Sequence, residues 1–213
     1  MVLFFLATTT LDANSFWTKL ENQPSITIVV YGTSLTAESQ WPEILINDLQ
    51  KKSKAKIKLI NSAMSGQHSK WGLENLYSLV ILKKPDIVFI EFAINDAHKR
   101  YGLTADNTRT NIHKMVIRIR SQLPNSEIIL MTMSDAKGKA EENRQFKVSQ
   151  YYQAVIDVAE LNQLKLVNLY PKWTKLRQTN LRLYNHYMPD GLHPTDVAAK
   201  EFIVPAIIEE LNE

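Results

Sequence analysis

Two kinds of hydrophobic pattern alternate along the chain. Short apolar runs rich in β-branched residues are typical of strands that are buried on both faces of a sheet. Between these runs, apolar residues recur at the three- and four-residue spacing of an amphipathic helix. The runs predict strands at residues 26–31, 57–61, 87–92, 127–133 and 164–169.

The periodic segments predict a helix before the first strand and after every strand. The first helix has Asn14 or Ser15 as its candidate cap, and the helix before the fourth strand has Asp106 or Asn107. Pro205 is expected to kink the last helix. The expected helices cover residues 13–21, 37–52, 71–82, 106–122, 143–163, 171–183 and 195–211, with irregular loops at 134–142 and 184–194.

This alternation predicts a single α/β domain over residues 1–213. Strands that alternate with helices form parallel sheets with right-handed crossovers. We therefore expect a three-layer α/β/α, flavodoxin-like architecture, in which helices cover both faces of a five-stranded parallel sheet. A chain of 213 residues with 45% hydrophobic residues is sufficient for one such core.

The first seven residues are apolar, but they lack the basic region of a signal peptide and are too short to span a bilayer. Residues 1–22 are therefore expected to form an arm and a short helix packed on the domain. A weak secretion signal is the alternative. No other segment reads as a transmembrane helix, so we expect a cytoplasmic protein without stable membrane insertion.

The amino-acid composition limits which kinds of binding or catalytic site the chain can contain. The absence of cysteine excludes disulfides and thiolate metal sites. No pair among the five histidines has metal-ligand spacing, so no metal is assigned. A net charge of +3 argues against a nucleic-acid partner. The basic run at residues 51–58 could bind an anionic partner, but a solvated helix end is the simpler interpretation.

Polar residues gather where the predicted strands end. Ser34 follows the first strand, residues 61–66 follow the second, and Asn95 follows the third. Because the carboxyl ends of parallel strands meet along one edge of a sheet, these groups are expected to share a crevice with the loop at 190–193. The loop at 134–142 is expected to border its rim. Taken alone, Ser34 is a nucleophile, a helix cap or a donor in an anion-binding loop.

Together, these residues have the chemistry that acyl transfer from an ester requires. Ser34 supplies a nucleophilic hydroxyl, His193 can take its proton, and Asp190 can orient the imidazole. The backbone N–H groups of Ser34 and Gly66, with the side-chain amide of Asn95, could stabilise the oxyanion. This set favours the nucleophile among the three interpretations of Ser34.

The same residues carry a family resemblance. The chain resembles the SGNH hydrolases, or GDSL-type esterases and lipases, whose four motif blocks occur in this order over nearly the whole chain. The resemblance implies the SGNH hydrolase fold, with Ser34 as nucleophile, Gly66 and Asn95 as oxyanion donors, Asp190 as orienting acid and His193 as base. The blocks are Gly-Thr-Ser-Leu from residue 32, Asn-Ser-Ala-Met-Ser-Gly from 61, Ala-Ile-Asn-Asp from 93 and Asp-Gly-Leu-His from 190.

Three positions depart from the family pattern. Thr33 stands where the family has an aspartate, so a charge beside the nucleophile is expected to be missing. Ala63 and Ala93 stand where the family usually has glycine. None of the three substitutions removes a proposed catalytic group, and together they indicate a divergent branch.

The favoured interpretation is a serine esterase without a cofactor. Its partner is expected to be a small-molecule or carbohydrate ester with a short acyl chain or an O-acetyl group. One alternative, motivated by the departures from the motif, is a non-catalytic carbohydrate-binding descendant. Another is an FMN-binding flavodoxin-like protein, in which the hydroxyl-rich loop at 32–36 holds the phosphate. The ester and the oligomeric state are left open by the sequence.

Overall fold

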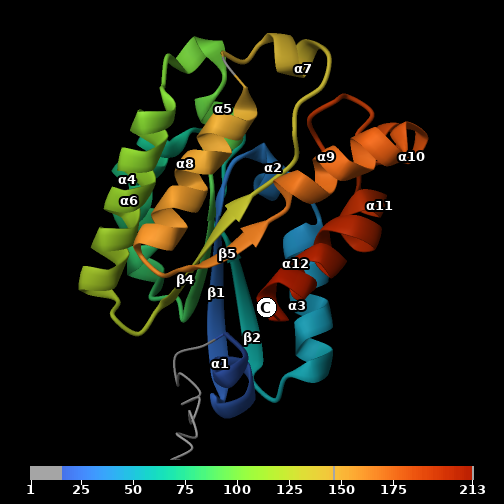
Figure 1. Cartoon of the computed structure of the whole chain (residues 1–213). Helices are drawn as coiled ribbons and strands as arrows, with labels where there is room; N and C mark the ends of the chain where they lie inside the picture. The colour runs from blue at the N-terminus through green and yellow to red at the C-terminus, as the bar shows by residue number, and fades with distance from the viewer. Residues whose placement is uncertain (1–15, 146, 213) are drawn as a thin grey trace, which may run out of the picture.

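A parallel sheet of five strands forms the centre of the computed structural model, which describes residues 16–145 and 147–212. The strands lie in the order β2-β1-β3-β4-β5, and every neighbouring pair is parallel (Figure 1). This confirms the predicted five-stranded parallel sheet. The strands are β1 (Ser25–Gly32), β2 (Lys56–Asn61), β3 (Ile87–Glu91), β4 (Glu127–Thr132) and β5 (Lys165–Asn168).

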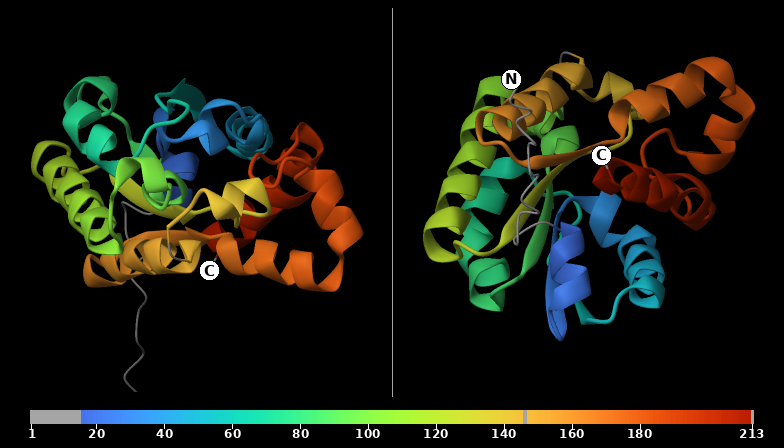
Figure 2. Two further views of the ribbon diagram at one scale, coloured as in Figure 1. Left: turned by 90° about the horizontal axis from the view of Figure 1, so that it is seen from above. Right: turned by 60° about the horizontal axis from the view of Figure 1, so that its bottom comes forward.

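Helices cover both faces of the sheet, as the alternating pattern predicted (Figures 1 and 2). One face carries α4 (Ser69–Leu79), α6 (Ala105–Gln122) and α8 (Val148–Leu161), and the other carries α3 (Trp41–Lys52) and α12 (Val204–Asn212). The arrangement is the three-layer α/β/α fold. The shorter elements are α1 (Phe16–Asn22), α2 (Ser34–Ala37), α5 (Ala93–Asp96), α7 (Lys139–Glu142), α9 (Tyr170–Thr179), α10 (Leu181–Tyr187), α11 (Asp196–Ala198), η1 (Ile81–Lys83), η2 (Lys99–Tyr101) and η3 (Ala199–Ile203).

The core is centred on β1 and β3. Every residue of β3 is buried, and β1 is buried from Ile28 to its end at Gly32. Both strands have neighbours on each side and helices on each face, which is why their sequences are continuous apolar runs rather than alternating ones. Burial of each large aliphatic side chain contributes about 1.5–3 kcal/mol. The central strands therefore hold the carboxyl edge of the sheet in a fixed position.

Some predicted helix boundaries are wrong, for local reasons. The helix expected from residue 37 begins only at Trp41, with Pro42 in its first turn, and a separate single turn, α2, precedes it and ends at Ala37. The cap of α6 is Thr104 rather than Asp106 or Asn107. Thr104 and Asn107 form a reciprocal capping box, which satisfies two backbone donors that a cap at Asp106 would leave unpaired.

The predicted helix at 143–163 is shorter than expected. It begins only at Val148, because residues 143–145 pair with α5 and η2 through hydrogen bonds from Gln145 N to Ala97 O (2.8 Å) and from Lys99 N to Asn143 O (2.9 Å). The stretch at 184–194 was expected to be irregular, yet its first residues belong to α10. That helix is capped by Asn180, whose side chain accepts from Leu183 N at 3.1 Å.

The helical region at the C-terminal end contains a π-helical segment, η3, directly before Pro205. Proline lacks the N–H that continues an α-helix, and its ring collides with the carbonyl four residues earlier. A widened π turn at this point is the departure from regular helix that accommodates the proline.

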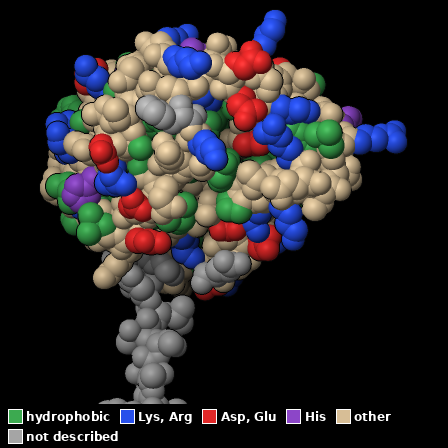
Figure 3. Space-filling model, turned by 45° about the horizontal axis from the view of Figure 1, so that its top comes forward, with side chains coloured by type: hydrophobic (Ala, Val, Ile, Leu, Met, Phe, Trp, Pro, Cys, Tyr) green, Lys and Arg blue, Asp and Glu red, His purple; other side chains and the backbone are tan. Residues whose placement is uncertain are grey.

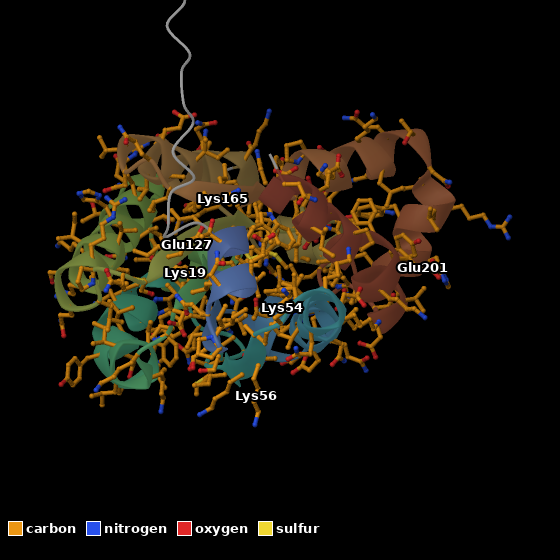
Figure 4. All side chains as sticks on the ribbon, turned by 90° about the horizontal axis from the view of Figure 1, so that it is seen from below. Lys19, Lys54, Lys56, Glu127, Lys165 and Glu201 are labelled. Carbon is orange, nitrogen blue, oxygen red and sulfur yellow. The ribbon has the colours of Figure 1, made fainter. Side chains whose placement is uncertain are left out.

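The amino-terminal edge of the sheet lies opposite the ends of the strands that carry the predicted site. Figure 4 looks onto this edge, where Lys54 and Lys56 of the basic run lie. The lysines of that run are exposed, and Lys51 pairs with Asp48 at 2.8 Å, as expected of a solvated helix end. The helix α1 packs at the same edge, with Trp17 Nε1 donating to Leu211 O at 2.9 Å.

The predicted arm before α1, with its candidate caps Asn14 and Ser15, lies outside the described residues. Across residues 16–145 and 147–212, no helix has the length and apolar character needed to cross a membrane.

Candidate active site

Four segments that carry the predicted site residues meet at the carboxyl edge of the sheet (Figure 1). The turn α2 follows β1, and α5 follows β3, the neighbour of β1 in the sheet. The loop after β2 is tied to the end of β1 by a hydrogen bond from Met64 N to Gly32 O at 3.0 Å. The fourth segment, the loop at 190–193, returns to this edge after α10.

The structure joins Ser34, His193 and Asp190 by hydrogen bonds. Ser34 Oγ lies 3.0 Å from His193 Nε2, and His193 Nδ1 lies 2.7 Å from Asp190 Oδ2. The other carboxyl oxygen of Asp190 accepts from the N–H groups of Leu192 (2.8 Å) and His193 (2.7 Å). Since Asp190 is held by the backbone of its own loop, the carboxylate and the imidazole keep a fixed relative orientation.

The electrostatics favour an ionised Asp190. Partial burial by itself raises the pKa of this carboxyl, but the hydrogen bonds from His193 and Leu192 outweigh burial and hold the pKa below its usual range. The side chains of His193 and Asp190 are 40% and 53% exposed. The candidate base His193 is therefore open to solvent, whereas Ser34 is buried, with 8% of its surface exposed.

The predicted oxyanion donors lie in adjoining segments. Within the described part of the chain, the backbone N–H groups of Ser34 and Gly66 make no hydrogen bond. The Asn95 amide donates one N–H to Gln67 O at 2.9 Å, which ties α5 to the loop that carries Gly66. Its second N–H has no partner among residues 16–145 and 147–212. Three donors are thus left unpaired in the adjoining segments that carry Ser34, Gly66 and Asn95, as the predicted oxyanion site requires.

Gly66 has a conformation that favours glycine, with φ of +71°. Its carbonyl oxygen accepts from the hydroxyl of Tyr101 and, at 3.4 Å, from Arg100 Nη2. The ring of Tyr101 lies 4.4 Å from that of His68, which caps α4 by accepting from Trp71 N at 3.3 Å. These contacts hold the backbone of Gly66, whose N–H is the second predicted oxyanion donor.

A buried carboxyl group that was not predicted from the sequence contacts the turn that carries Ser34. Glu91 ends β3 and is 2% exposed, and its Oε1 accepts from Thr33 N and Thr33 Oγ1, each at 2.8 Å. Burial raises its pKa to about 7, and the hydrogen bonds from Thr33 and Thr36 oppose that rise. The sequence predicted only the loss of the aspartate at position 33, whereas in the structure β3 supplies a carboxyl group that contacts Thr33. The sequence contained one indication of this buried carboxyl group, which is a glutamate at the end of the most apolar strand.

Asp96 is a second buried carboxyl, and its contacts are structural. It accepts from Ser69 N at 2.7 Å and from Thr108 Oγ1 at 2.6 Å, and so joins α5 to α4 and α6. Burial raises its pKa to about 6. Ala93 is buried at the start of α5, and Ala63 donates its N–H to Asn61 Oδ1 at 3.1 Å, so both alanines fit the backbone without a glycine.

The loop at 134–142 packs directly against the loop that carries Asp190 and His193. Lys137 N donates to Gly191 O at 2.8 Å, and Ser134 Oγ donates to Leu192 O at 3.3 Å. On its other side the loop borders a cavity of about 590 Å³, lined by residues that include Asp135, Arg144 and Arg177. Acidic and basic side chains intermingle on this upper face of the molecule (Figure 3).

The described residues contain no group of three or more His, Asp or Glu side chains arranged for a metal ion.

Comparison with known proteins gives a consistent result. The model of the GDSL-like lipase/acylhydrolase family matches residues 25–200. An arylesterase from Vibrio mimicus is 25% identical over 206 residues, which cover 89% of this chain and 92% of that protein. A lipase/acylhydrolase from Enterococcus faecalis has a TM-score of 0.75 at 25% identity, with 87% of this chain and 95% of that chain covered. An acetylxylan esterase from Geobacillus stearothermophilus shares the fold, with a TM-score of 0.76, 19% identity and coverage of 92% and 97%.

Proposed function

The chain belongs to the GDSL-like lipase/acylhydrolase family and is an ester-bond hydrolase, and we propose that it cleaves carboxylic esters through an acyl-enzyme on Ser34. The observation that carries this proposal is the continuous hydrogen-bonded chain from Ser34 Oγ through His193 to Asp190, with distances of 3.0 and 2.7 Å. A serine that only capped a helix would not need a base at hydrogen-bond distance.

In the acylation step, Ser34 Oγ attacks the ester carbonyl carbon while His193 Nε2 takes the hydroxyl proton. Asp190 keeps the proton of the imidazole on Nδ1 and stabilises the imidazolium that forms. The carbonyl oxygen becomes an oxyanion, which the N–H groups of Ser34, Gly66 and Asn95 would stabilise. The tetrahedral intermediate collapses when the bond to the alcohol oxygen breaks, and His193 donates its proton to the departing alcohol.

Deacylation repeats these roles with water as the nucleophile. His193 takes a proton from a water molecule that attacks the acyl carbon, and the second tetrahedral intermediate is stabilised by the same donors. When the bond to Ser34 Oγ breaks, His193 returns the proton to the serine. The products are one carboxylic acid and one alcohol, and the enzyme regains its starting state.

We propose a short acyl chain, above all an acetyl group, as the acyl part of the substrate. The exposure of His193 and Asp190 supports an alcohol part that extends into solvent, such as a sugar or an aryl group. The arylesterase and the acetylxylan esterase to which the chain is similar act on esters of these two kinds according to their names.

The test is hydrolysis of 4-nitrophenyl esters of increasing acyl length and of acetylated xylo-oligosaccharides. Ser34→Ala is expected to abolish turnover and labelling by a fluorophosphonate probe, and the acetyl ester is expected to be the best of the series. The exposed Ser78, whose hydroxyl donates to Asn75 O on α4, supplies the control variant Ser78→Ala with unchanged rates. Equal rates for Ser34→Ala and the wild type would overturn the mechanism. Sugar binding without labelling would instead identify a non-catalytic carbohydrate-binding protein.

A further inference from the structure

Glu91 occupies an unusual position for an ionisable side chain. It is the last residue of the central strand β3, it is 2% exposed, and its register partner in β1 is Gly32. A carboxyl group buried at this depth costs free energy unless donors surround it. The donors that Glu91 has all belong to the turn that carries Ser34.

The carboxyl group holds both ends of that turn. Oε1 of Glu91 accepts from Thr33 N and Thr33 Oγ1 on one side of Ser34, and from Thr36 Oγ1 at 2.9 Å on the other side. Thr33 Oγ1 in turn accepts from Leu35 N at 3.2 Å, which caps α2. Since α2 is a single turn of four residues, it is too short to be stable by itself, and these contacts determine its conformation.

Gly32, the partner of Glu91 on the neighbouring strand, leaves the space that the carboxyl group occupies. A β-carbon at Gly32 would lie 2.5 Å from both the carbonyl oxygen and Oε1 of Glu91, and 2.8 Å from its Cδ. The side chain of Glu91 therefore folds back over Gly32 to reach Thr33, and only glycine leaves the space for it. Gly32 and Glu91 form a matched pair on adjacent strands.

We propose that Glu91 is a positioning residue for the nucleophile: it fixes the turn from Thr33 to Thr36 so that Ser34 directs its hydroxyl to His193 and keeps its N–H free. This inference rests on the proposed function of Ser34. The physical reason is that the hydroxyl and the N–H of one residue must serve two different reaction partners at once, which a four-residue turn achieves only when its backbone is held at both ends.

The surroundings of Glu91 keep the carboxyl group available as an acceptor. Asp96 on α5 and Tyr152 on α8 interact electrostatically with it. Within the described part of the chain, no Lys, Arg or His forms an ion pair with Glu91, so no cation there competes with the turn for the carboxyl oxygens. Thr33 and Thr36 are themselves buried, so water does not replace their hydrogen bonds to Glu91.

The test measures kcat and KM per active site, where the sites are counted by titration with a fluorophosphonate probe. Glu91→Gln keeps the size of the side chain and one acceptor oxygen but removes the charge. We expect kcat per titrated site to fall about tenfold, less than the ~10²-fold loss that a displacement of 1 Å can cause, with KM nearly unchanged. A purely structural role would lower the number of titratable sites but leave kcat per site unchanged.

Asp86→Asn is the matched control. Asp86 lies just before β3 and accepts from Thr27 N of β1 at 2.7 Å, so it joins the same two strands at the end away from the site. Its kcat per site is expected to equal that of the wild type. An equal loss in Asp86→Asn and Glu91→Gln would overturn the inference, because the loss would then follow from weaker strand pairing.

A double-mutant cycle tests whether Glu91 acts through the turn. Thr36→Val removes one donor and is expected to lower kcat per site about threefold, whereas Thr36→Ser keeps the hydroxyl and the rate. The variant with both Thr36→Val and Glu91→Gln should lose less than the product of the two single losses. Independent losses would overturn the inference. If Glu91→Gln does not fold, the contrast between Thr36→Val and Thr36→Ser decides the question.

The outcomes for the two proposals are distinct. Residual turnover in Ser34→Ala would refute the proposed function and with it the role of Glu91. An inactive Ser34→Ala together with full kcat per site in Glu91→Gln would refute only the positioning role.

Discussion

The backbones of Lys137 and Gly191 are in direct contact: the N–H of Lys137 donates to Gly191 O at 2.8 Å, and a β-carbon on Gly191 would collide with the carbonyl oxygen of Lys137. Gly191 also has a φ of +78°. It lies between Asp190 and His193, so this contact determines where the candidate acid and base are held.

Gly191→Ala is therefore expected to lower kcat by about 10²-fold, because the loop must move away from Lys137 and carry His193 with it. The control is Gly102→Ala. Gly102 has a similar φ of +61°, but nothing lies within 4 Å of the position of its β-carbon. Each variant should lose about 1 kcal/mol of stability from its left-handed backbone, whereas only Gly191→Ala should lose activity. Thermal unfolding and ester hydrolysis measure the two effects, and similar activities would contradict the prediction.

Asp190→Asn is expected to lower kcat by about 10³- to 10⁴-fold with little change in KM. The amide can still accept from the N–H groups of Leu192 and His193, so the loop keeps its shape. It cannot stabilise an imidazolium, and it permits the tautomer of His193 that has no free acceptor at Nε2. Steady-state kinetics at neutral pH measure the loss. A loss smaller than tenfold would indicate that a different group orients the base.

Asn95→Ala is expected to lower kcat by about 10²- to 10³-fold, the usual cost of one oxyanion donor. The same change removes the hydrogen bond from Asn95 to Gln67 O, so part of the loss comes from a displaced loop. Gln67→Ala separates the two effects. It keeps the backbone carbonyl that accepts from Asn95, so its activity should be close to that of the wild type. Equal losses in the two variants would argue against a direct role of Asn95.

Stability is expected to fall as pH rises between about 4.5 and 7. Burial raises the pKa of Glu91 from 4.5 to about 7, so in this window the folded state binds more protons than the unfolded state. Asp96, raised from 3.8 to about 6, acts in the same direction at lower pH. The lowered pKa of Asp190 acts oppositely: its contribution to stability is complete above the usual pKa of an aspartate and is lost as pH falls below that value.

Urea denaturation of the wild type and of Glu91→Gln across pH 4.5 to 8 isolates the contribution of Glu91. The variant cannot ionise at this position, so its free energy of unfolding should rise relative to the wild type as pH increases to about 7 and stay level above that. A difference that does not change with pH would show that Glu91 does not titrate in this range.

Much of the fold could be predicted from local sequence patterns, because the burial of each strand and helix face determines which residues are apolar. The buried part of β1 at residues 28–31 and the first four residues of β3 are continuously apolar, which few structures other than a central parallel strand permit. The errors lie where a distant contact overrides a local signal. Residues 143–145 have a helical pattern, but they pair with α5 and η2 instead.

The candidate site also has one part that the sequence predicted and one part that only the structure revealed. Ser34, Gly66, Asn95, Asp190 and His193 were found from residue type, position after a strand and order of the motif blocks, and the structure brings all five to one edge of the sheet. Their roles stay predictions until they are measured.

The sequence by itself determined the alternating elements, the sheet and the candidate site residues, because the hydrophobic period and the order of the motifs are properties of the chain. Only the tertiary structure decided that Glu91 lies against Gly32 and holds Thr33 and Thr36. That contact depends on the order and register of β1 and β3, two strands separated by more than fifty residues. Side-chain hydrogen bonds between neighbouring strands leave no periodic pattern in the sequence. The contact of Glu91 with the turn that carries Ser34 could therefore be recognised only in the structure.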